Sequence, residues 1–65
     1  MQLLTNDGQV VTEDTFLNAF ASASLSTPFE TAKVIVDQYR KFLPEDEIRA
    51  LQRLANQAIT TYIEG

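Results

Sequence analysis

The chain has 65 residues, nine acidic and five basic side chains, a formal net charge of −4 at pH 7, and neither cysteine nor histidine. A single core below about 70 to 80 residues supplies only a few kcal/mol of stability, so residues 1–65 form one small domain at most. The missing cysteine and histidine exclude a disulfide and the usual structural zinc site. We therefore expect a domain without a metal or a cofactor.

The acidic composition also bears on partners and on location. An excess of acidic side chains disfavours nucleic acid and anionic membranes and favours another protein as partner, although such a charge also serves simply to keep a small domain soluble. No segment has the features of a signal peptide or of a membrane span. The cysteine-free composition fits a reducing compartment, and we expect a cytoplasmic protein.

The first predicted element is a β-hairpin over residues 2–11. Apolar and β-branched arms flank the turn sequence Asn6-Asp7-Gly8, in which Gly8 can adopt the positive φ that a tight hairpin turn requires. Two strands alone are marginally stable in water, so we expect the hairpin to pack on helices or to pair with the hairpin of another chain.

A first helix is predicted over residues 13–24. Thr12 has the character of an N-cap, and Glu13 and Asp14 place negative charge in the first turn, where the helix dipole favours it. The serine-rich run near residue 24 weakens the helix and ends it. Its apolar face consists of Phe16, Leu17, Phe20 and Ala23.

A second helix is predicted over residues 28–42. Thr27 is suited to the N-cap, Pro28 to the first helical position, and Glu30 to the third position of a capping box. The predicted apolar stripe consists of Phe29, Ala32, Ile35, Val36, Tyr39 and Phe42.

A third helix is predicted over residues 44–63, with Pro44 at its first position and an acidic first turn. The link from the second helix is so short that the two should form an antiparallel helical hairpin. The expected fold is mostly α: a short N-terminal β-hairpin followed by a three-helix bundle. Its expected core contains Phe16, Phe20, Ile35, Tyr39, Leu51 and Ala55.

The third helix has a wider apolar stripe than one small core requires. Apolar residues cover about half of its circumference, whereas a helix in a small core uses a stripe of about 100°. We predict that the surplus is an interface with a partner or with a second copy, formed by Leu54, Ala58, Ile59, Tyr62 and Ile63. The alternative is that the hairpin and the first helix cover both flanks of the stripe.

The sequence has little equipment for catalysis. Without histidine or cysteine, the commonest general base and the strongest nucleophile are missing. Serines 22, 24 and 26 have only Lys33 or Lys41 as conceivable bases, and their run is more typical of a helix end. We therefore predict that the chain is not an enzyme.

The first two helices and the turn between them also suggest a helix-turn-helix, in which the second helix would read the DNA major groove. Acidic and basic side chains alternate on its outward face, so phosphates would be repelled about as much as attracted. That face consists of Glu30, Lys33, Val34, Asp37, Gln38 and Lys41.

The sequence thus favours a non-catalytic protein-interaction module, a small regulator or accessory subunit that binds a protein partner or forms a homodimer through the third helix. A DNA-binding transcriptional regulator of the helix-turn-helix type is the alternative.

Overall fold

The computed structural model describes residues 2–23 and 25–65 and confirms the expected fold class. The chain is mostly helical, with a two-stranded antiparallel hairpin followed by three α-helices. The elements in chain order are β1 (Gln2–Leu4), β2 (Val10–Thr12), α1 (Glu13–Ser22), α2 (Pro28–Tyr39), the 3-10 turn η1 (Arg40–Phe42) and α3 (Glu45–Glu64).

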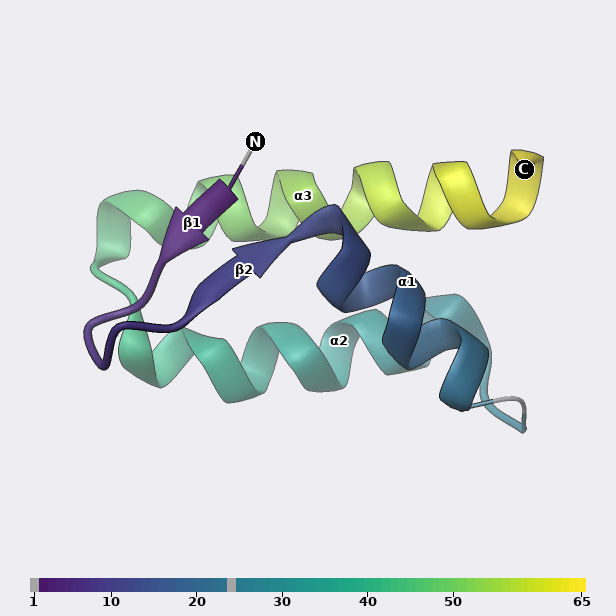
Figure 1. Cartoon of the computed structure of the whole chain (residues 1–65), viewed down its shortest axis with the longest axis horizontal. Helices are drawn as coiled ribbons and strands as arrows, with labels where there is room; N and C mark the ends of the chain where they lie inside the picture. The colour runs from purple at the N-terminus through teal and green to yellow at the C-terminus, as the bar shows by residue number, and fades with distance from the viewer. Residues whose placement is uncertain (1, 24) are drawn as a thin grey trace.

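The elements form two layers (Figure 1). The long helices α2 and α3 lie side by side and run in opposite directions, as the short link between them predicts. The hairpin and α1 lie across one face of this helix pair. Helix α1 contacts both long helices, and β1 also contacts α3. The opposite face of the α2–α3 pair is therefore free of these N-terminal elements.

The hairpin contributes one of its two sides to the core. Leu3 pairs with Val11 across the strands, and both side chains are buried, whereas the neighbouring pair of Leu4 and Val10 points to solvent. This alternation follows from the two-residue period of a strand. At the turn Gly8 has φ +88°, the left-handed conformation expected there.

The starts of α1 and α2 show why these helices begin where they do. The backbone N–H of Thr12 donates a hydrogen bond to Thr15 Oγ1 at 3.1 Å, and Thr27 Oγ1 accepts one from the backbone N–H of Glu30 at 3.2 Å. Pro28 occupies the first turn of α2 as predicted. Side-chain oxygen atoms thus satisfy helix-terminal groups that would otherwise lack partners.

The predicted helix ends need correction. Helix α1 ends at Ser22, where residue 24 was predicted, and Ser24 itself lies outside the described residues. Helix α2 ends at Tyr39, and its predicted last turn is the 3-10 turn η1. Pro44 is the N-cap of α3, with ψ 157°, and not its first helical residue. The extended backbone of Leu43, which the following proline enforces, separates the two long helices.

The core lies between the two layers. Of the six predicted core residues, Phe16, Phe20, Ile35, Leu51 and Ala55 are buried, and Tyr39 packs against them at the edge. The prediction for the second helix is wrong at both ends of its stripe, because Phe29 is 63% exposed and Phe42 is 43% exposed. The remaining buried apolar side chains are Leu3, Val11, Ala32, Leu43, Leu54, Ala58 and Ile59.

Candidate protein-binding surface

Three of the five residues predicted for an interface on the third helix are buried in the chain's own core. Leu54 is 1% exposed, Ala58 is fully buried, and Ile59 is 8% exposed. Helix α1 packs against α3 and fills the flank of the stripe that was expected to be surplus. Leu54 and Ala58 are therefore corrected from interface to core, as the alternative interpretation of the wide stripe anticipated, whereas Ile59 lies in the core and also lines the open side of the helix pair.

The other two predicted residues are exposed but lie on different sides of α3. Tyr62 packs its ring edge against Phe20 of α1, with 5.4 Å between the ring centroids, and covers that end of the core. Ile63 is 61% exposed and lies beside α2. Of the predicted surface, Ile63 and the small exposed part of Ile59 thus belong to the open side of the helix pair.

That open side carries two adjoining hollows of about 330 Å³ each. All the residues that line them come from α2 and α3, so neither the hairpin nor α1 covers them. We call this surface the α2–α3 face. Its residues are Phe29, Lys33, Val36, Gln52, Ala55, Asn56, Ile59, Thr60, Ile63 and Glu64.

Phe29 is the main residue of this face that the sequence analysis assigned elsewhere. It lines both hollows and lies across the groove from Ile59. The sequence does contain a sign of this exposure. Phe29 precedes Ile35 by six residues, which corresponds to roughly 120° around a helix and places Phe29 at the edge of the apolar stripe. Phe29 is accordingly covered only in part by its neighbours, and 63% of its surface is open to a partner.

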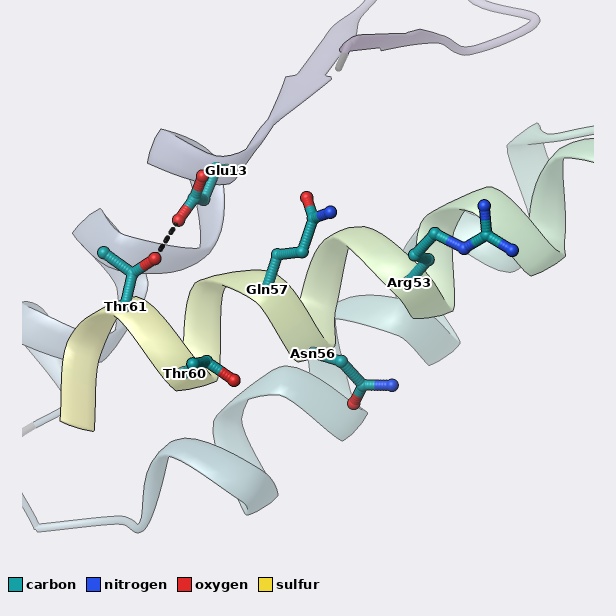
Figure 2. A pocket seen from close by; sticks show the side chains of 6 residues that line it. All are labelled: Glu13, Arg53, Asn56, Gln57, Thr60 and Thr61. Carbon is teal, nitrogen blue, oxygen red and sulfur yellow. Dashed lines mark hydrogen bonds between the residues drawn. The ribbon is translucent and has the colours of Figure 1, made fainter. Parts of the chain in front are cut away.

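A hollow of about 430 Å³, lined by polar and charged residues, continues the α2–α3 face around α3 (Figure 2). Asn56 and Thr60 line both it and the apolar part of the face. At its far side, Thr61 Oγ1 donates a hydrogen bond to Glu13 Oε1 at 2.5 Å, which ties α1 to α3. Arg53 lies at the other end of this hollow.

Charge is unevenly distributed along α3. Glu45 and Asp46 are exposed in the first turn, Arg49 and Arg53 follow them in the first half of the helix, and Glu64 is exposed at its last position. Residues 54–63 include no charged side chain, although Asn56, Gln57 and Thr60 among them are exposed. The exposed side of α3 is therefore acidic in its first turn, basic at Arg49 and Arg53, neutral over residues 54–63 and acidic again at Glu64.

A second exposed apolar site is the outer side of the hairpin. Leu4 and Val10, opposite each other across the strands, are 63% and 52% exposed. This pair stands on strands of three residues, and very short edge strands are a common defence against pairing with another chain. The hairpin is therefore a smaller candidate surface than the α2–α3 face.

The helix-turn-helix alternative requires an outward side of α2 that is exposed and basic. The outward side of α2 is exposed but not basic. All six residues expected on the outward face are exposed, five on α2 and Lys41 on η1, and acidic and basic side chains alternate among them. Outside residues 1 and 24, the structure contains no cluster of three acidic side chains that could hold a metal ion. No helix in the described part of the chain is long and apolar enough to cross a membrane.

Comparison of the chain with models of protein families, with curated proteins and with solved structures finds no match. The candidate surface is therefore assigned from its geometry and composition alone.

Proposed function

We propose that the chain is a non-catalytic protein-interaction module, a small regulator or accessory subunit, that binds its protein partner through the α2–α3 face. The observation that carries the proposal is the pair of large apolar side chains, Phe29 and Ile63, exposed on the side of the helix pair that the rest of the fold leaves uncovered. A cytoplasmic location fits the cysteine-free sequence and remains a prediction.

The composition of the face supports this proposal. The centre of a protein interface is depleted of charged side chains and enriched in aromatic ones, and its rim is polar. On the α2–α3 face, Phe29, Ile59 and Ile63 are the apolar centre, and the only charged residues are Lys33 and Glu64. A partner that covered the face would thus remove apolar surface from water and leave both charges near the edge.

The experiment compares two charged variants, each in an exposed apolar residue of a long helix. Ile63→Asp changes the α2–α3 face, whereas Val34→Asp changes a residue that is 55% exposed on another side of α2. Proteins retained from the native host by the wild-type chain are quantified for both variants, and circular dichroism confirms that both remain folded. We expect Ile63→Asp to lose the specific partner and Val34→Asp to retain it. Equal retention by the two variants would refute the proposed surface.

A further inference from the structure

We propose that Asp7 is a modification site, which converts to isoaspartate by reaction with the backbone nitrogen of Gly8, and that the folded hairpin turn slows this reaction. The site lies on the hairpin and is independent of the α2–α3 face. Asp7 and Gly8 are both exposed in the turn between β1 and β2. Of the four aspartates in the sequence, Asp7 alone is followed by a glycine.

The reaction needs only the chain and water. The Gly8 nitrogen bonds to Cγ of Asp7, and the carboxyl hydroxyl leaves with the amide proton as one water molecule, which closes a succinimide ring. Water then opens the ring at either carbonyl. Opening at the backbone carbonyl leaves the main chain running through Cβ and Cγ, as isoaspartate, whereas opening at the other restores aspartate. Glycine favours ring closure because it has no Cβ to crowd the attacking nitrogen.

The hydrogen bonds of the turn identify its geometry. The backbone N–H of Gly8 donates to the carbonyl oxygen of Thr5 at 3.1 Å, and the N–H of Thr5 donates to the carbonyl oxygen of Gln9 at 2.8 Å. Gly8 has φ +88°, and no non-glycine residue in the described part of the chain has a positive φ. These features define a type I turn over residues 5–8 that ends in a left-handed glycine, a common form of the three-residue hairpin loop.

This geometry keeps the two reacting atoms apart. Asp7 occupies the third position of the type I turn, where ψ is about 0°. At that ψ the Gly8 nitrogen eclipses the backbone nitrogen of Asp7 and lies away from the Asp7 Cβ. Ring closure therefore requires a rotation about ψ of Asp7, and this rotation breaks the hydrogen bond from Gly8 to Thr5.

Thr5 restrains both reacting groups. Its hydroxyl donates a hydrogen bond to Asp7 Oδ1 and accepts one from the backbone N–H of Gln9 at 2.9 Å. Thr5 is only 4% exposed, so water competes little for these bonds. Its hydroxyl thus holds the carboxyl group, and its carbonyl oxygen holds the nitrogen that would attack. Conversion therefore proceeds from the open turn, at a rate that follows the population of that state.

The product cannot rebuild this turn. Isoaspartate adds one carbon to the main chain between residues 7 and 8, so Thr5 cannot keep its backbone bonds with both Gly8 and Gln9. The turn sets the strand register that places Leu3 and Val11 in the core. The modified chain is therefore less stable, and the reaction makes the stability of the domain depend on its age.

The test incubates the full-length chain in mildly acidic buffer at physiological temperature, once under native conditions and once in denaturing urea. Peptide mapping with electron-transfer fragmentation distinguishes isoaspartate from aspartate at each position. Asp14, Asp37 and Asp46 are internal controls, because none of them precedes a glycine. We expect isoaspartate at residue 7 alone, forming at least about tenfold faster in urea than in native buffer. Equal rates in the two solutions, or no isoaspartate at residue 7 in urea, would overturn the proposal.

Three variants test whether the turn itself controls the reaction. Thr5→Val removes the hydroxyl that holds the carboxyl group, Thr5→Ser keeps it, and Thr27→Val removes a hydroxyl from the cap of α2, away from the turn. Thr5→Val should raise the native rate by roughly fivefold to tenfold, the effect of one lost hydrogen bond, and the other two should stay within about threefold of the wild type.

A wild-type rate in folded Thr5→Val would overturn the control by the turn. An equal rise in Thr27→Val would overturn it too, because it would show that the reaction follows unfolding of the whole domain. The wild-type chain in buffer and in urea decides the proposal even where a variant fails to fold, which circular dichroism reveals.

Discussion

Replacement of Leu51 by alanine tests whether α3 holds the two layers together. Leu51 is fully buried in the middle of the core, and a buried Leu→Ala change costs about 2 to 5 kcal/mol. At about 0.05 to 0.15 kcal/mol per residue, a domain of 65 residues has a total stability of roughly 3 to 10 kcal/mol. The variant should therefore lose at least a fifth of its stability and, toward the upper end of the cost, unfold.

Ile63→Ala is the matched control on the same helix. Because Ile63 is 61% exposed, removing its outer atoms should cost about 1 kcal/mol or less. Urea titration followed by far-UV circular dichroism, at low protein concentration, measures both variants. With a denaturant slope near 1 kcal/mol per M, we expect the midpoint of Leu51→Ala to fall by about 2 M or more. Equal midpoints for the two variants would show that the assignment of the core is wrong.

Further predictions concern the turn, a helix cap, the edge of the core and nucleic acid. Gly8→Ala should lose about 1 to 2 kcal/mol in the same titration, because an L side chain is strained at φ +88°, and an unchanged midpoint would contradict this turn geometry. Thr27→Ala should lose about 0.5 to 2 kcal/mol with its capping hydrogen bond, and Ser26→Ala should lose less; the reverse order would argue against the cap. Ile59→Asp should unfold the chain, because it buries an unpaired charge. A native circular dichroism spectrum of this variant would show that Ile59 is not a core residue. Binding to duplex DNA, measured by fluorescence anisotropy at physiological salt, should be no tighter than about 10⁻⁴ M, and micromolar, salt-sensitive binding would favour the DNA-binding alternative.

The order and type of the elements were predictable because local signals agree with one another. Thr27, Pro28 and Glu30 determine where α2 begins, and Gly8 determines where the hairpin turns. The helix ends were less predictable, because they depend on how the chain closes its last turn. The backbone N–H of Asn6 donates to the carbonyl oxygen of Phe42 at 2.6 Å, a contact between distant segments that the sequence does not reveal.

The candidate surface was predictable only in part, and for a physical reason. A helical wheel shows how wide an apolar stripe is but not which neighbours cover it. Packing of α1 against α3 buries Leu54 and Ala58, whereas Phe29, at the edge of its own stripe, remains exposed. Which flank of a wide stripe is surplus depends on the placement of the other elements.

The most direct test of the α2–α3 face is a series of amide NMR spectra of the wild-type chain with increasing amounts of a protein that it retains from the native host. If the partner binds this face, the shifts should change most at Phe29, Asn56 and Ile63 and least at the outer hairpin residues Leu4 and Val10. Changes centred on Leu4 and Val10 would contradict the account, because they would place the interface on the opposite layer of the molecule.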